Sequence, residues 1–309
     1  MARGRAVAAI LAAAGVLLIS APEASAAPDC ARSPTPRVLY SAQGLLESVT
    51  VGRAGRLYFS SRPATGVGRL IKVDHPGATP HILVDDIDSP GGMVWDHRRL
   101  IAGFGDDVPN GSQGDDDPKA GLERVNPKTG AHSVLLRGLG MANGVARAPD
   151  GTIFASNDFG RKLDRVVGRT VTHGWAEVES SNGLAVDPAG RFLYVAQTFV
   201  TVPAIKRVEI ANPRHVRTFA SSPEDQNAFL DGMTRDAEGT LYVAANGAGE
   251  VWRVDTRGRI CVLARGLQNP SAVAFGRGPR RFAGGNLYAV TFSGDVVELP
   301  RANRARFAG

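Results

Sequence analysis

One phrase recurs along the chain, and its spacing restricts the possible folds more than any other feature of the sequence. It reads ANGVARAPDGTIFASN at 142–157, SNGLAVDPAGRFLYVAQ at 181–197 and FLDGMTRDAEGTLYVAANG at 229–247. Copies that start at 47, 91, 143, 182, 231 and 271 are separated by 44, 52, 39, 49 and 40 residues. Self-similarity at a period of about 40–50 residues indicates a propeller or a solenoid.

Each copy has the pattern of two short strands, in which apolar and polar residues alternate and a glycine marks the turn. Further strands follow most copies, as LERVNPKTGAHSVLL and VWRVDTRGRICVLA show best. Four short strands in a repeat form one propeller blade, whereas a β-sandwich would not repeat at this period. The sequence therefore predicts an all-β, six-bladed β-propeller with four-stranded blades. It would be a single domain over 27–309, closed by an N-terminal strand against the last blade.

The first 26 residues have the pattern of a secretory signal peptide. Arg3 and Arg5 precede a short apolar run over 7–19, and the small residues 24–26 form a cleavage site. An uncleaved anchor is the alternative. With the leader removed, we expect a secreted or extracytoplasmic monomer that does not contact a membrane.

The two cysteines, Cys30 and Cys261, lie near opposite ends of the mature chain. In an oxidising compartment they would form a disulfide that ties the N-terminus to the last structural unit. Two unpaired cysteines are the alternative. The formal net charge of +6 comes from scattered residues, and no recognisable nucleic-acid-binding motif accompanies it. We therefore expect a small-molecule substrate and no nucleic acid.

Equivalent residues of six blades would form a ring around the propeller axis. Two carboxylates and two amides in this ring would offer the oxygen ligands of a hard divalent cation, and no His or Cys is present for a structural zinc site. Turn chemistry is the alternative reading of the Asn-Gly and Asp-Gly dipeptides. A glutamate followed by serine is no turn dipeptide, however, and its presence in register favours the cation. The aligned phrase starts are Glu47, Gly91, Asn143, Asn182, Asp231 and Ser271.

Several of these segments resemble the regucalcin, gluconolactonase and luciferin-regenerating-enzyme family. ESVTVGRAGRLYFSS is similar to the family's first phrase, and NGLAVDPAGRFLYVAQT and DGMTRDAEGTLYVAANGAGEVWRVD are similar to two later motifs. The resemblance implies a six-bladed propeller with one divalent cation at its axis, commonly calcium. It also implies that Glu47, Asn182 and Asp231 are metal ligands and that Asn143 lines the substrate pocket.

The chain departs from the family pattern at several positions. Ser48 and Val49 replace the Gly-Pro that follows the first glutamate, and Ser61 replaces an aspartate. Met141 stands where some relatives have an arginine that helps to bind sugar acids. These changes imply a pocket that is less polar than a sugar-acid site.

The resemblance implies a metal-dependent hydrolase that opens a lactone or related ester, in which Asp231 assists removal of a proton from water. A non-catalytic ligand- or protein-binding propeller with a structural metal, and a cyclase or lyase that uses the same pocket, are the alternatives. The second strand of each phrase should return to the same mouth, so its end residues are candidates for a moderately apolar pocket. These candidates are Phe104, Asn157, Thr198, Asn246 and Phe292.

One segment, GDDVPNGSQGDDDPK at 105–119, is rich in Asp, Gly, Asn and Ser. This composition is typical of a solvated, mobile loop. A lid over the pocket and a second calcium loop are the alternatives, although the segment lacks the EF-hand spacing of acidic residues.

Overall fold

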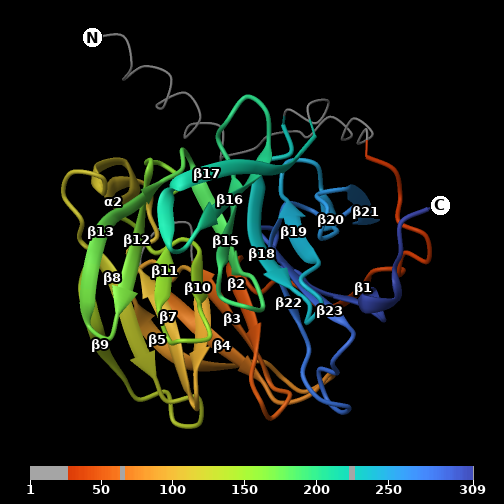
Figure 1. The fold of residues 1–309 in the computed structure, drawn as a ribbon. Coiled ribbons are helices and arrows are strands. Elements are labelled where there is room, and N and C mark those ends of the chain that lie inside the picture. The colour runs from red at the N-terminus through yellow and green to blue at the C-terminus, as the bar shows by residue number, and fades with distance from the viewer. Residues whose placement is uncertain (1–26, 63–66, 223–226, 309) are drawn as a thin grey trace.

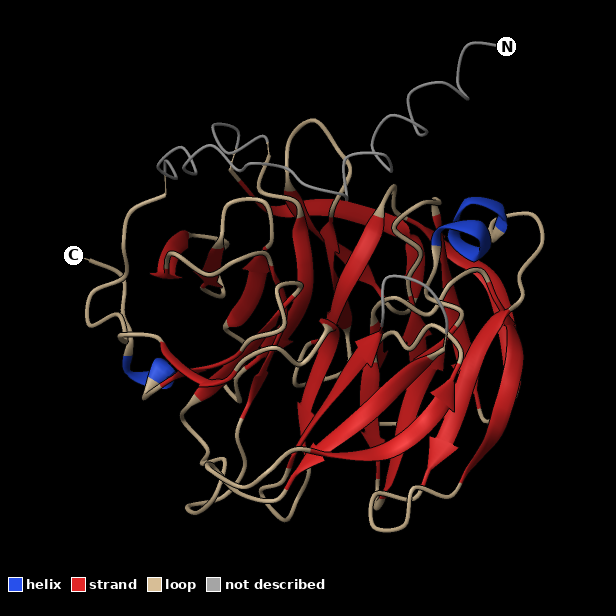
Figure 2. Ribbon diagram, turned by 180° about the vertical axis from the view of Figure 1, so that it is seen from behind, coloured by secondary structure: helices blue, strands red, loops and turns tan. Residues whose placement is uncertain are grey.

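The computed structural model describes residues 27–62, 67–222 and 227–308, and it confirms the predicted architecture. Six four-stranded antiparallel sheets are arranged as blades around a central axis (Figure 1). The predicted signal peptide over 1–26 lies outside the described residues. Strands make up the body of the molecule, and the two short helices of the described residues lie outside them (Figure 2).

The first strand of each phrase is the innermost strand of its blade, because these six strands contact one another in a ring. The blades are numbered here in the order of the phrases. Blade 1 contains β2 (Leu45–Val51), β3 (Leu57–Arg62), β4 (Gly68–Val73) and β5 (His81–Ile87). Blade 2 contains β6 (Met93–Asp96), β7 (Arg99–Phe104), β8 (Ala120–Val125) and β9 (His132–Leu139). Blade 3 contains β10 (Val145–Arg147), β11 (Ile153–Ala155), β12 (Lys162–Val167) and β13 (Thr170–Glu177). Blades 4 and 5 contain β14 (Ser181–Val186), β15 (Phe192–Gln197), β16 (Ala204–Glu209) and β17 (Asn212–Ser221); and β18 (Leu230–Arg235), β19 (Leu241–Ala245), β20 (Glu250–Val254) and β21 (Ile260–Ala264).

Burial falls from the axis to the rim of a blade, and the sequence pattern follows it. Every residue of the inner strand β14 is buried, whereas most residues of the outer strand β17 are exposed or half-buried. In blade 4 the inner strand therefore reads as a run of small and apolar residues, and the outer strand contains charged residues, whereas the outer strand β21 of blade 5 is apolar and buried. The core lies between blades: Trp252, for example, packs in a cluster shared by blades 4 and 5.

Blade 6 is built from both ends of the chain, as predicted. Its three C-terminal strands are β22 (Pro270–Phe275), β23 (Leu287–Thr291) and β24 (Val296–Leu299), and the N-terminal strand β1 (Arg37–Tyr40) completes the sheet. Strand β1 runs antiparallel to β24, with Arg37 opposite Glu298. The pairing of β1 with β24 completes blade 6, and the inner strand β2 of blade 1 contacts β22 and β23, so the ring has no gap between its first and last blades.

The predicted disulfide between Cys30 and Cys261 is present, with an S–S distance of 2.05 Å. We expected it to join the N-terminus to the last structural unit, but it joins the N-terminal segment to blade 5 instead. Cys261 lies in β21, the outer strand of blade 5, and the segment around Cys30 runs along that strand through a parallel bridge between Asp29 and Val262. The N-terminal segment thus crosses the edge of blade 5 before it enters blade 6.

Helices are short and peripheral. The helix α2 (Val108–Gln113) lies between β7 and β8, and the 3-10 helix η2 (Ala302–Arg304) follows β24. In the described parts of the chain, we find no helix with the length and apolar character needed to cross a membrane.

Candidate functional site

A β-bulge at the start of the inner strands directs the phrase-start side chains into the axial cavity. In blade 4 the register of β14 against β15 shifts across Asn182 and Gly183, so that these two residues stand opposite one residue. Glu47 in blade 1 and Asp231 in blade 5 lie in the same two-against-one arrangement. A bulge leaves its extra residue free of the regular pleat and re-aims its side chain. The side chains of Glu47, Asn182 and Asp231 all line the axial cavity.

The glycine after each phrase start is required by the crowding of neighbouring blades. A Cβ on Gly183 would lie 2.2 Å from the carbonyl oxygen of Asp231, and a Cβ on Gly144 would lie 2.2 Å from that of Asn182. Neither glycine has a positive φ, and Asn182 and Asp231 lie within strands. The alternative reading as turns is therefore wrong for Asn182-Gly183 and Asp231-Gly232, whereas Asn143-Gly144 lies in a bend just before β10. Glycine is present because the next inner strand leaves no room for a side chain.

Four carboxylates gather at this end of the axis, and one guanidinium lies among them. Glu47 and Asp231 come from inner strands, whereas Asp106 and Asp158 follow the second strands β7 and β11. We call these four residues the axial carboxylate cluster. Each is at most 7% exposed. Arg62, the last residue of β3, is the cation of the group.

The arginine engages only part of this cluster. Its Nη2 lies 2.9 Å from Oε2 of Glu47, and its Nη1 lies 3.5 Å from Oδ2 of Asp106 and donates to the Asp106 carbonyl oxygen. Within the described ranges, neither carboxylate oxygen of Asp106 nor Oδ1 of Asp158 accepts a hydrogen bond of ordinary geometry. Such orphaned buried oxygens are uncommon in folded proteins and indicate an unfilled interaction.

Burial and mutual repulsion weaken the acidity of the whole cluster. Burial, against the opposing charge of Arg62, raises the pKa of Glu47 to about 8 and that of Asp106 to about 6. Burial and the neighbouring carboxylates also raise the pKa values of Asp158 and Asp231 well above their ordinary range. The raised pKa values mean that the four carboxyl groups cannot all be ionised comfortably beside one guanidinium.

The cavity next to the cluster is small. It has a volume of about 60 Å³ and is lined by the inner strands, including Glu47, Asn143, Asn182 and Asp231. Ligand pockets of drug-like size usually measure about 300–1,000 Å³. The axial cavity can thus hold an ion or a few atoms of a ligand, and the rest of a substrate would lie outside it. A larger hollow of about 580 Å³ lies at the opposite end, among turns such as 235–238 that carry none of the predicted site residues.

Two of the predicted pocket residues support Asp231. The side-chain amide of Asn246 donates to Oδ2 of Asp231 at 3.4 Å. The hydroxyl of Thr198 donates to the carbonyl oxygen of Leu230 at 2.7 Å and so links the end of β15 to the residue before Asp231. Both residues therefore lie at the end of the propeller that carries the phrase-start residues, as the strand topology predicts.

The other three are placed differently. Phe104 packs between blades 1 and 2 with the Arg137 guanidinium 4.7 Å from its ring, so it is not brought to the cavity. The amide of Asn157 donates to the carbonyl oxygen of Gly111 at 2.9 Å and binds helix α2 instead of lining an open space. Phe292 is half-buried and follows β23 at the same end of the molecule.

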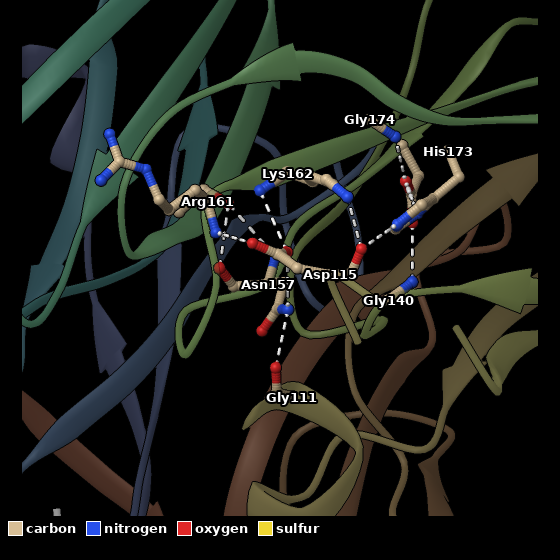
Figure 3. A network of polar contacts seen from close by, with 10 residues as sticks. Gly111, Asp115, Gly140, Asn157, Arg161, Lys162, His173 and Gly174 are labelled. Atoms are coloured by element: carbon tan, nitrogen blue, oxygen red, sulfur yellow. Dashed lines mark hydrogen bonds and ion pairs between the residues drawn. The ribbon is translucent and has the colours of Figure 1, made fainter. Parts of the chain in front are cut away.

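The acidic segment 105–119 is docked against blade 3, which corrects the expectation of a solvated, mobile loop. The Asp115 carboxylate accepts hydrogen bonds from the backbone N–H groups of Arg161 at 2.8 Å and Lys162 at 3.2 Å. The Asp115 carbonyl oxygen accepts from the Lys162 ammonium and lies 3.1 Å from Nε2 of His173. Figure 3 shows Asp115 between these groups, with Asn157 joining the same network. Composition failed here because each of these contacts is made by another blade.

Three phenylalanines lie beside the axial site on the loops that carry its residues. We call Phe159, Phe199 and Phe229 the aromatic run. The ring centroids of Phe159 and Phe199 are 5.3 Å apart, and those of Phe199 and Phe229 are 6.1 Å apart. Phe199 is 42% exposed. Because Phe159 follows Asp158 directly, the run borders the axial carboxylate cluster and offers it an apolar neighbour.

The chemistry of these residues fits a hard cation. Carboxylate and amide oxygens are the ligands that calcium and magnesium take. In the described parts of the chain, the carboxylate oxygens of Asp106 and Oδ1 of Asp158 have no hydrogen-bond donor of ordinary geometry, although Arg62 lies 3.5 Å from Oδ2 of Asp106. Among the described residues no three His, Cys, Asp or Glu side chains form a group that could hold a metal ion by themselves. The amides of Asn143 and Asn182 would therefore have to complete the set.

Sequence reasoning missed Arg62 and Asp158, and it considered Asp106 only as part of the acidic segment 105–119 and not of the axial site. All three lie at or just after the end of a second strand, within one or two residues of positions that we considered. Asp158 directly follows the candidate Asn157. A search for charged residues within three positions of each strand end would have found all three.

Comparison with known proteins places part of the chain in a known family and identifies proteins with the same fold. Residues 160–282 match the family model of the SMP-30/Gluconolactonase/LRE-like region, a stretch that contains Asn182 and Asp231. A gluconolactonase from Xanthomonas campestris is similar over 91% of this chain and 99% of its own, with 18% identity and a TM-score of 0.69. The calcium-binding protein regucalcin from Agrobacterium tumefaciens is similar over 90% and 95%, with 18% identity and a TM-score of 0.66.

A luciferin-regenerating enzyme is similar over 89% of this chain and 98% of its own, with 13% identity and a TM-score of 0.66. No curated protein matches the chain. At these identities the solved structures establish the fold, and the matched region confirms the resemblance seen in the motifs. The chain therefore carries an SMP-30/gluconolactonase/LRE-like region on a six-bladed β-propeller.

Proposed function

We propose that the protein is an exported hydrolase of the gluconolactonase type, which opens a lactone or related ester with one divalent cation, calcium being the first ion to test. The observation that carries the proposal is the axial carboxylate cluster, with its orphaned oxygens on Asp106 and Asp158. Four buried carboxylates beside a single guanidinium are unfavourable, and a divalent cation would supply further positive charge. The family match over 160–282 supports the reaction class. The disulfide and the leader-like sequence over 1–26 support export.

Glu47, Asn182 and Asp231 would hold the cation, and Asn143 would lie beside it. When bound, the cation supplies Lewis-acid polarisation of the ester carbonyl and stabilises the developing oxyanion. Asp231 accepts a proton from water as the water oxygen bonds to the carbonyl carbon. The ring C–O bond then breaks, and the proton passes to the departing alkoxide to give a hydroxy acid. Asn246 keeps the Asp231 carboxylate in place through its hydrogen bond.

Within this reaction, the aromatic run favours a substrate with an apolar substituent. The axial cavity is too small for a whole ligand, and the neighbouring surface presents the exposed ring of Phe199. Met141, which replaces a sugar-acid-binding arginine of some relatives, is buried. We therefore expect alkyl- or aryl-substituted lactones to be better substrates than sugar lactones. Phe199→Ala should lower kcat/KM for a long-chain lactone by about tenfold, or about 1.4 kcal/mol, because a partly exposed ring contributes less than the roughly 1.5–3 kcal/mol of a fully buried one. It should leave γ-butyrolactone nearly unaffected.

The first experiment titrates the chelator-stripped protein with calcium and measures the thermal midpoint of unfolding at each calcium concentration. A ligand that binds only the folded state at a hundred times its Kd adds about 2.7 kcal/mol of stability. Asp231→Asn and Glu47→Gln should lose this response, whereas Asp150→Asn, at an exposed turn outside the site, should retain it. A lactone and ester panel with the calcium-loaded protein then tests hydrolysis.

Two results would contradict the proposal. If no divalent ion shifts the midpoint of a protein that metal analysis shows to be metal-free, the cation site is refuted. If calcium binds but no lactone or ester is hydrolysed, the chain is a binding propeller with a structural metal.

A further inference from the structure

Arg62 lies where a bound cation would have to compete with it. It is the last residue of β3 and stands opposite Leu45 at the start of β2, two residues before Glu47. From there its guanidinium reaches Glu47 and Asp106, residues of two different blades. Its side chain is 25% exposed, so the guanidinium has a route towards solvent that the buried carboxylates lack.

The arginine supplies part of the positive charge that the cluster needs. Four carboxylates surround it, and its charge acts on Glu47, Asp106 and Asp158. The nearest of these contacts is the 2.9 Å ion pair with Oε2 of Glu47, the residue that the family pattern assigns to the metal. Orphaned oxygens remain on Asp106 and Asp158, so one guanidinium does not satisfy the cluster.

We propose that Arg62 is a built-in counter-cation of the axial site. The Arg62 guanidinium pairs with the Glu47 carboxylate when no metal is bound, and a divalent cation displaces it on binding. The inference rests on the proposed function only in taking Glu47 as a ligand. Two positive groups at one carboxylate repel each other strongly in a buried setting, so guanidinium and divalent ion exclude each other there. Arg62 therefore stabilises the metal-free protein and weakens its affinity for the cation.

The test compares calcium binding and stability in Arg62→Gln, Arg62→Lys and Arg56→Gln. Arg56 precedes β3 at the opposite end of the strand and forms an ion pair with Asp74 at 2.6 Å, so its substitution removes the same charge far from the axis. The Kd for calcium is measured by isothermal titration calorimetry, and thermal midpoints are measured in chelator and in saturating calcium.

We expect Arg62→Gln to bind calcium at least about fivefold more tightly than wild type, the lower end of ordinary coupling between two sites. It should also melt below wild type in chelator and at or above it in calcium. Arg62→Lys keeps the charge and should bind calcium nearly as wild type does. Arg56→Gln should change neither the Kd nor the difference between the two midpoints.

A purely structural Arg62 would give another pattern, with both midpoints lowered equally and the Kd unchanged, and this result would overturn the proposal. Weaker calcium binding by Arg62→Gln would also overturn it, as would the absence of calcium binding in wild type and variant alike. If Arg62→Gln unfolds in chelator, it is prepared in calcium and its Kd is obtained by competition with a chelator. Calcium binding that tightens in Arg62→Gln, together with a failed lactone panel, would uphold this inference and refute the hydrolase.

Discussion

Gly183→Ala is the sharpest test of how the axial site is built. The new Cβ would lie 2.2 Å from the Asp231 carbonyl oxygen and 2.7 Å from the Met233 nitrogen. Real Cβ contacts are essentially never shorter than 3.0 Å, so the two inner strands must separate by about 0.8 Å (3.0 − 2.2). Both contacts are backbone atoms, which no rotamer change can relieve. Overpacking of this kind costs up to about 3 kcal/mol, and in a chain of this size that lowers the thermal midpoint by roughly 6–12 °C.

Gly168→Ala is the matched control. Gly168 has a φ of +64° and nothing within 4 Å of its would-be Cβ, so the substitution carries only the strain of a left-handed residue, about 1–2 kcal/mol. Urea unfolding measures both free energies. The Gly183 variant should also bind calcium more weakly, because the separated strands carry Asn182 and Asp231. If Gly183→Ala costs no more than Gly168→Ala, close approach of the blades is not the reason for the glycine.

Three other predictions follow from contacts away from the axis. Replacing Cys30 and Cys261 by alanine opens a covalent loop of 231 residues, so guanidinium unfolding should show a loss of up to about 5 kcal/mol, and an unchanged unfolding free energy would contradict this. Burial lowers the pKa of His132, but Glu123 and a second carboxylate raise it, and the net shift is upward. The ion pairs of His132 therefore stabilise the folded state below the pKa of about 6.5 in the unfolded chain, and this stabilisation is lost as pH rises through the pKa in the folded state. The gap in thermal midpoint between wild type and His132→Gln should therefore be larger at pH 6 than at pH 9, and a constant gap would refute the assignment. Asp115→Ala removes the anchor of α2, so hydrogen exchange should speed up over 108–114 while the inner strands keep their protection; equal exchange in α2 would contradict the docking.

The repeat made the fold predictable, because every copy places the same positions on an inner strand. That register brought Glu47, Asn182 and Asp231 to one axis without any knowledge of the loops. Arg62 and Asp158 were missed because they lie at strand ends, where loops of different length follow and the repeat no longer constrains position. The reason for Gly183 was also hidden, since a neighbouring blade causes the crowding and turn preference offers an equally good local explanation.

The pairing of β1 with β24 has a consequence for the order of folding. Arg37 and Glu298 are paired across 261 residues of sequence, which makes this contact among the costliest in loop entropy to form. A chain emerging from the ribosome can pair the strands of blades 1 to 5 as they appear, but the ring stays open until the last strands are made. The axial carboxylates come from blades 1, 2, 3 and 5, so they assemble fully only when the ring closes. A cation held between Glu47 of blade 1 and Asp231 of blade 5 would therefore bind only after ring closure and would stabilise the closed ring.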